Sequence, residues 1–147
     1  MPSFKSSEKL MDSIDISDPL MRREVLKTNN NPGESIDYIV TVKGRLDRLK
    51  NTEGGREVII RYVPDRFILI PDSFSTYIGN MANGPWDSLE AIAVAILEDI
   101  NNELVPRWVR ITVNSVDLQA EDIPLHSVSM EDHQPHWENK GLINSIV

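Results

Sequence analysis

The stretch of the chain that decides its fold is WDSLEAIAVAILEDINNEL, residues 86–104. Its apolar residues recur at spacings of three and four, which is the period of one face of an α-helix. They are Trp86, Leu89, Ile92, Ala93, Ile96, Leu97, Ile100 and Leu104. Pro85 suits a first helical turn, and Asp87 and Glu90 stand where the positive end of the helix dipole favours carboxylates. The pattern predicts a long amphipathic helix that ends near residues 101–106.

Segments on both sides of this helix have the patterns of β-strands. Apolar and polar residues alternate over 36–43, and an apolar run follows at 58–63. Between them, 51–55 contains residues able to adopt positive φ, so we expect an antiparallel hairpin. After the helix, alternation over 108–115 predicts a third strand, and 125–130 gives a fourth.

The order strand, strand, helix, strand, strand excludes a doubly wound parallel sheet, which needs alternating strands and helices. It predicts an α+β fold in which helices cover one face of a four-stranded antiparallel sheet. We place this domain at 35–130, between an N-terminal arm or linker (1–34), with a short helix around 19–26, and a C-terminal tail (131–147). A short apolar run at 66–70 ends at Pro71. The edge strands of so small a sheet have unpaired backbone N–H and carbonyl groups. These groups would be hydrogen-bonded if subunits joined edge to edge in a closed barrel.

Composition excludes several classes of function. The chain has 147 residues, 40% of them apolar, and a formal net charge of −8, so a single globular domain with little affinity for nucleic acid is expected. It lacks an apolar run of the roughly 20 residues that a membrane span needs, and its first residues lack the apolar core of a signal peptide. We therefore expect a cytoplasmic protein that does not bind membranes. Because there is no cysteine, disulfides, thiolate metal sites and thiolate nucleophiles are excluded.

Several motifs together resemble the 7-cyano-7-deazaguanine reductase family of the queuosine pathway. They are Arg61-Tyr62-Val63-Pro64-Asp65, Glu90 at the start of the helix, Leu97-Glu98-Asp99 and the segment 106–113. The resemblance covers about residues 36–116. It implies the tunnelling fold (T-fold), a homo-oligomeric barrel, and a purine- or pterin-like heterocycle bound at the subunit interfaces.

The resemblance implies roles for individual residues. The glutamate that anchors the heterocycle falls on Glu90, where a carboxylate can accept two N–H bonds in parallel. The preceding histidine of the family is replaced by Leu89. The catalytic cysteine falls near Asp47, and the acid aspartate falls near Gly54, beside Glu53. Asp47 and Glu53 are therefore candidate catalytic residues and Glu90 a candidate substrate-binding residue. The simpler alternatives are dipole complementarity for Glu90 and a solvated charged hairpin end for Asp47.

The cofactor motif of the family aligns with 70–77, where only a serine and the terminal tyrosine are kept. Asp72 stands where a cation should meet phosphate, so NADPH binding by the family's route is not expected, and the cofactor stays unknown. The histidines of the last part of the chain, His126, His133 and His136, form only a weak metal-binding pattern. Docking of an aromatic residue of the tail on a neighbouring subunit is a simpler explanation of that segment than a metal site.

Three functions follow in order of preference. The first is an enzyme that binds a heterocycle through Glu90 and uses chemistry independent of a thiolate. The second is a non-catalytic ligand-binding or scaffold protein of the same fold. The third, a genuine NADPH-dependent nitrile reductase, is disfavoured because its covalent step needs the missing cysteine.

Overall fold

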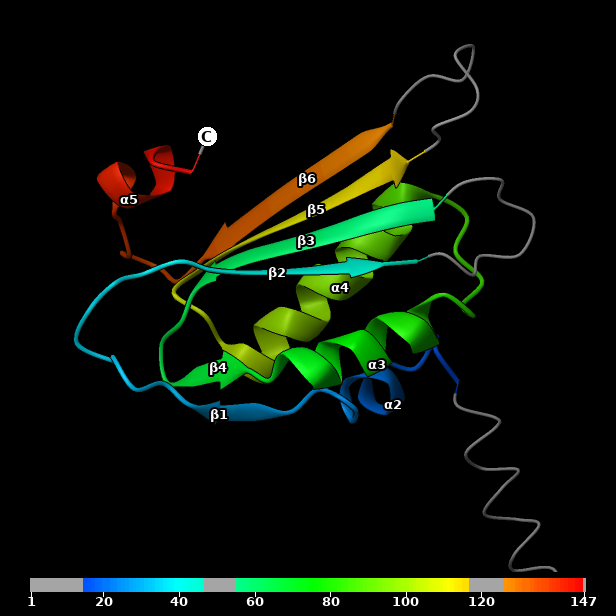
Figure 1. Ribbon diagram of the computed structural model, residues 1–147, viewed down its shortest axis with the longest axis horizontal. Coiled ribbons are helices and arrows are strands. Elements are labelled where there is room, and N and C mark those ends of the chain that lie inside the picture. Colours follow the sequence, from blue (N-terminus) through cyan, green and yellow to red (C-terminus); the bar gives the residue numbers. More distant parts are fainter. Residues whose placement is uncertain (1–14, 47–54, 117–125, 147) are drawn as a thin grey trace, which may run out of the picture.

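The computed structural model describes residues 15–46, 55–116 and 126–146 (Figure 1). It has the mixed α+β architecture that the element order predicts. The elements run along the chain as α2 (Pro19–Arg23), β1 (Thr28–Asn30), β2 (Val40–Arg45), β3 (Gly55–Val63), β4 (Phe67–Leu69), α3 (Pro71–Met81), α4 (Leu89–Leu104), β5 (Trp108–Val116), β6 (Ser127–His133) and α5 (Lys140–Asn144).

The main sheet has four strands in the order β2-β3-β5-β6, and every neighbouring pair is antiparallel. The predicted hairpin and the two later strands are thus confirmed, with β6 reaching His133. The first strand begins at Val40 instead of residue 36. Arg107 explains the difference, because its Nη1 binds the carbonyl oxygen of Ile36 at 3.1 Å and its Nη2 binds that of Glu34, which holds this segment in a loop.

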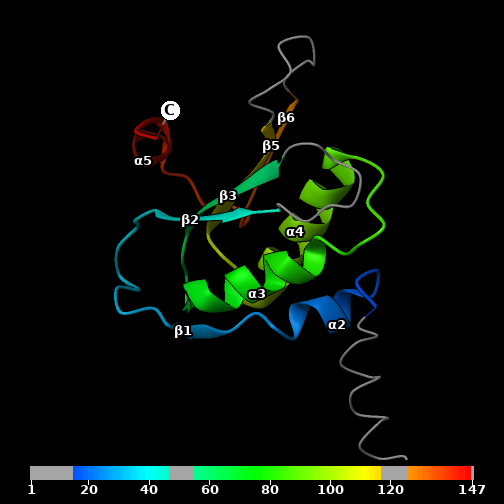
Figure 2. The same cartoon turned by 45° about the vertical axis from the view of Figure 1, so that its right-hand side comes forward.

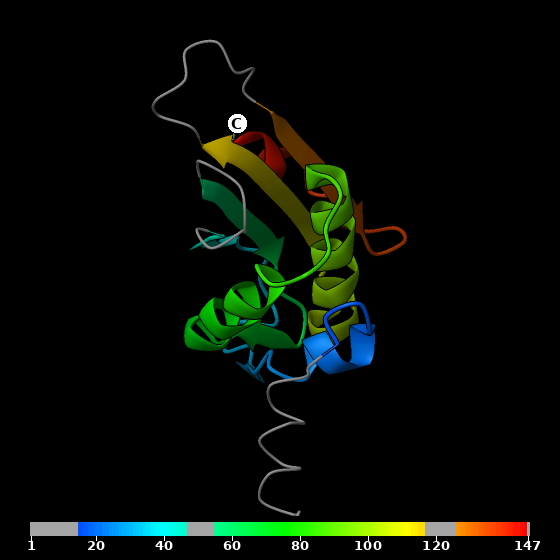
Figure 3. The ribbon, with the colours of Figure 1, turned by 90° about the vertical axis from the view of Figure 1, so that its right-hand side faces the viewer.

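Helix α4 lies across one face of this sheet, and α3 lies beside it on the same face (Figure 3). The apolar stripe read from the sequence is the face that α4 buries, including Ile92, Ile96 and Ile100. The helix begins at Leu89 instead of Trp86 because Ser88 caps it from an extended conformation, its Oγ accepting a bond from the Ala91 N–H at 3.1 Å. It ends at Val105, which has a left-handed conformation with φ 45°.

Helix α3 was not predicted from the sequence. It begins with Pro71 at a position that needs no N–H donor, and it buries Phe74, Tyr77, Ile78 and Met81. Its sequence contains serine, threonine, tyrosine and glycine, whose helix propensities are modest, so propensity alone gave no clear signal. Burial of its apolar face against the rest of the molecule stabilises it instead.

The segment before the main sheet packs on the helices. The short helix expected around 19–26 is present as α2, which lies beside α3 (Figure 2). Strand β1 pairs with β4 in a separate two-stranded sheet (Figure 1). Ile16 and Leu26 from this segment are buried in the common core. The division of the chain at residues 34 and 130 stays a prediction. In the described ranges, no helix is both long and apolar enough to cross a bilayer.

Candidate functional site

The helix-facing side of the main sheet changes from apolar to polar at one end. Val58 and Val113 are paired in register and fully buried, and Val113 is paired in turn with Val128. Two residues before Val58 on β3, Arg56 is paired with Ser115. The Ser115 N–H donates to the carbonyl oxygen of His126 at 2.8 Å. Because side chains alternate between the faces of a strand, Arg56 and His126 continue the core-facing rows of valines with polar groups.

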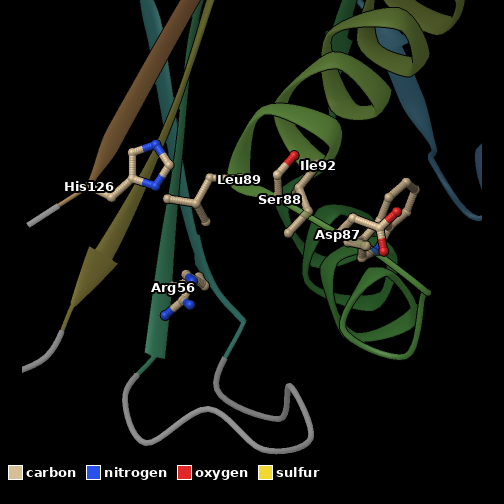
Figure 4. A pocket seen from close by; sticks show the side chains of 7 residues that line it. Arg56, Asp87, Ser88, Leu89, Ile92 and His126 are labelled. Atoms are coloured by element: carbon tan, nitrogen blue, oxygen red, sulfur yellow. The ribbon is translucent and has the colours of Figure 1, made fainter.

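A pocket of about 310 Å³ lies between this polar end of the sheet and the start of α4 (Figure 4). Arg56 and His126 line its strand side, and Asp87, Ser88 and Ile92 line its helix side. Leu89 and Trp86 complete the lining. The pocket therefore has apolar walls and a few polar groups of both charges, which is the usual composition of a small-molecule site.

The Trp86 side chain is held in place by three neighbours. Its Nε1 donates to the carbonyl oxygen of Met81 at 2.7 Å. The guanidinium carbon of Arg22 lies 6.0 Å from the ring centroid, within the range of a cation–π contact. Gly84 leaves space for the indole, since a Cβ atom there would lie 2.3 Å from Nε1. These contacts give the pocket an aromatic wall of defined position.

Glu90, the predicted anchor, lies in the first turn of α4 and contacts His126. Glu90 Oε1 and His126 Nε2 are 2.6 Å apart, and both side chains are 52% exposed. A polar contact between side chains this exposed contributes at most about 1 kcal/mol, so a ligand can replace one partner at little cost. The Glu90 carboxylate thus lies at the pocket, bound to one of the residues that line it.

The sequence reasoning did not connect His126 with Glu90. The resemblance places the family's histidine at Leu89, which is buried and lines the pocket, whereas in the structure the imidazole of His126 reaches Glu90 from the strand side. The sequence pattern associates His126 only with the weak metal-binding pattern of the tail. A signal was present, because His126 has the same period-2 phase as Val128 and Met130, two residues that pack on the core.

The other predicted site residues have different outcomes. Asp47, Glu53 and the neighbouring Gly54 lie outside the residues that the structure describes. Within the described ranges, no group of three or more histidine, aspartate or glutamate side chains is placed to hold a metal ion. His133 Nδ1 lies 2.9 Å from the carbonyl oxygen of Gln134.

The tail binds its own chain. Trp137 Nε1 and Asn139 Nδ2 donate to Asp37 Oδ2, at 3.3 and 3.1 Å. Gln134 Nε2 donates to Asp65 Oδ2 at 2.9 Å. Arg107 binds carboxylate oxygens of the same two aspartates. The indole N–H of Trp137 therefore has a partner within its own subunit, and docking of the tail on a neighbouring subunit stays a prediction.

The two residues kept from the family's cofactor motif, Ser73 and Tyr77, lie in α3 and have partners outside that helix. Ser73 Oγ accepts a bond from the Lys27 N–H at 2.9 Å and donates to the Ile70 carbonyl oxygen at 2.7 Å. The buried hydroxyl of Tyr77 donates to Asp99. Burial and the adjacent Asp99 carboxylate raise the pKa of Tyr77 well above its usual value, so the phenol stays a neutral donor. Packing is enough to explain why this serine and tyrosine are present.

Among solved structures, the chain is similar to one described as the crystal structure of the archaeosine synthase QueF-Like in the apo form. The sequences are 24% identical, the TM-score is 0.49, and the match covers 63% of this chain and 91% of that one. No protein-family model matches the chain, and no curated protein matches it either. The similarity is one of backbone arrangement over part of the chain.

Proposed function

We propose that this chain is a T-fold protein that binds a purine- or pterin-like heterocycle in the pocket at the start of α4. The observation that carries the proposal is the position of Glu90, whose carboxylate is bound to a lining residue of a pocket that also has an aromatic wall. The sequence resemblance assigns the heterocycle-binding role to this same glutamate.

Two interactions would hold the ligand. The Glu90 carboxylate accepts two parallel N–H bonds from the amidine-like edge of the ring, a geometry that gives both energy and orientation. The heterocycle also contacts the indole of Trp86, since aromatic rings favour stacked or edge-on contacts. On binding, the ring edge replaces at least part of the Glu90–His126 pair.

We propose that the protein is an enzyme whose reaction does not use a thiolate. His126 is the residue proposed to move a proton, because its imidazole lines the pocket and its Nε2 lies 2.6 Å from Glu90 Oε1. A nitrile reductase that works through a thioimide is disfavoured, since the chain has no cysteine.

A non-catalytic heterocycle-binding protein is the second candidate. The observation that favours it is that Ser73 and Tyr77, kept from the cofactor motif, are occupied by contacts within the fold. Binding without turnover of any guanine-, deazaguanine- or pterin-type compound would identify this function.

The binding test compares the wild-type protein with Glu90→Gln by titration calorimetry, using 7-deazaguanine and pterin as ligands. Loss of a charge-assisted bidentate contact should weaken binding by about tenfold to a hundredfold, since such hydrogen bonds contribute about 1.5–3 kcal/mol. Glu98→Gln, on the same helix and 61% exposed, is the matched control and should bind like the wild type. Absence of binding to the wild type, or equal binding by Glu90→Gln, would rule out the proposed site.

A further inference from the structure

Arg56 is a cation at the pocket whose side chain forms no ion pair with any residue that the structure describes. It lines the pocket from β3 and is half-buried. Its one hydrogen bond to the described part of the chain runs from Nη1 to the neutral carbonyl oxygen of Gly55 at 3.4 Å. Arg22, which lies against the Trp86 ring, is by contrast paired with Asp99 at 2.5 Å.

Arg56 lies where a guanidinium without a carboxylate partner among the described residues is costly. It has the same strand phase as Val58, Ile60 and Tyr62, all fully buried on the helix-facing side of the sheet. Turning a guanidinium toward this layer removes part of its hydration, which costs free energy unless an anion replaces the water. An arginine with no binding role would lose less hydration free energy on the opposite face of the same strand, away from the helices, where Arg61 lies.

The charges of Arg56 and Asp87 lie on opposite sides of the pocket. Arg56 is on the strand side, whereas Asp87 is on the helix side (Figure 4). Glu90 Oε1, from the first turn of α4, lies 2.6 Å from Nε2 of the lining residue His126. An anionic group near either carboxylate would be repelled, and the same group near Arg56 would be attracted. The pocket therefore favours one orientation of a ligand that has N–H donors at one place and a negative charge at another.

We infer that the ligand of this pocket is a heterocycle that carries an anionic substituent, a carboxylate or a phosphate, which the Arg56 guanidinium binds. The inference rests on the proposed function and narrows its ligand class. A guanidinium fork matches both anions, because each offers two oxygens in one plane for parallel N–H bonds. The volume of about 310 Å³ lies at the lower end of the range for small-molecule sites, which suits a compact ligand of this kind.

Two matched ligand pairs test the inference by calorimetry: guanosine with guanosine 5′-monophosphate, and pterin with 6-carboxypterin. In at least one pair, the anionic member should bind the wild type about tenfold tighter or more than its neutral parent, because a charge-assisted pair contributes about 1.5–3 kcal/mol. The pair that shows the gain identifies the anion as phosphate or carboxylate. Arg56→Gln should bring the affinities of the anionic member and its parent to within about twofold of each other, whatever the affinity of the variant for the parent.

Two further variants make the result specific. Arg56→Lys keeps the charge but not the fork, so it should retain only part of the gain. Arg61→Gln removes an arginine from the outer face of the same strand and should keep the whole gain. If the gain survives in Arg56→Gln, or if neither pair shows a gain, the inference is wrong.

The outcomes separate this inference from the proposed function. If the parent compounds bind in a way that depends on Glu90 and the anion adds no affinity, the heterocycle site is supported and the anionic substituent is ruled out. Failure of all four compounds to bind would reject both. Thermal unfolding of each variant verifies that the altered proteins are folded.

Discussion

At the scale of single residues, the most consequential group outside the pocket is Asp99. Its side chain is fully buried in α4, and Oδ2 accepts bonds from Arg22 Nε at 2.5 Å and from the Tyr77 hydroxyl. These contacts join α2, α3 and α4. Arg22 also lies against the ring of Trp86, so the buried cluster continues to the wall of the pocket.

Asp99→Asn should destabilise the protein strongly. It keeps the shape of the side chain but leaves the buried Arg22 guanidinium without its counter-charge, and breaking a buried pair from one side costs about 3–5 kcal/mol. The free energy of unfolding, measured by urea denaturation, should fall by that amount.

Glu98→Gln is the control for this experiment. Glu98 is the next residue on the helix, its carboxylate is 4.0 Å from Arg22 Nη2, and its side chain is 61% exposed. Exposed pairs contribute little, so the change should stay within about 0.5 kcal/mol. Equal effects of the two substitutions would show that burial of the Arg22–Asp99 pair is unimportant.

At the scale of elements, α3 approaches β2 closely because β2 has a glycine at the contact. A Cβ atom on Gly44 would lie 3.1 Å from Phe74 Cε2 and 3.3 Å from Ile78 Cγ1. Both side chains are buried, so they have little space to move. The contact between helix and sheet thus depends on one residue whose importance the strand pattern alone does not reveal.

Substitutions of two glycines by alanine should have opposite effects. Gly44→Ala should destabilise the protein by about 1–3 kcal/mol, the usual cost of overpacking a core. Gly79→Ala, on the exposed side of α3, meets nothing within 4 Å and should stabilise it by about 0.5–1 kcal/mol through helix propensity. Urea denaturation of both variants measures the two changes. A stabilising Gly44→Ala would contradict the close contact.

At the scale of the whole molecule, the main sheet ends in β2 on one side and β6 on the other. Edge strands carry unpaired N–H and carbonyl groups, and joining the two edges of successive subunits would satisfy them. Backbone bonds link Ser115 with His126 and Gln134 with Arg107. Because bonded and non-bonded pairs alternate along an antiparallel ladder, the intervening Ser129 directs its N–H to the free edge.

We expect the protein to be a homo-oligomer joined through these edges. Ser129→Pro removes one outward N–H without removing a bond to β5, so it should weaken assembly and leave the subunit folded. Sedimentation velocity should show the wild type as an oligomer and Ser129→Pro shifted toward the monomer. Ser129→Ala, which loses only the hydroxyl contact with Thr112, should assemble normally. A monomeric wild type would exclude the barrel.

Periodicity was sufficient to predict the parts of the fold whose burial follows a local pattern. The apolar stripe of α4 and the alternation in the main strands predicted the helix, the antiparallel sheet and the layer arrangement, because side-chain direction in these elements repeats with a fixed period. The resemblance and the preference of carboxylates for the N-terminal turn of a helix both predicted Glu90 at the start of the helix. In the structure Glu90 lies in the first turn of α4.

Other features required the tertiary structure, because they depend on residues far apart in the chain. The pairing of β1 with β4, the loop held by Arg107 and the packing of α3 all arise from contacts that no local pattern encodes. The same holds for the pocket. Glu90, Arg56 and His126 come from a helix, from a strand and from the position just before another strand, and only the folding of the sheet against α4 brings their side chains to one place. The sequence by itself therefore determined the layers and the place of Glu90 at the start of the helix, whereas the surroundings of Glu90 were decided by the approach of separate elements in space.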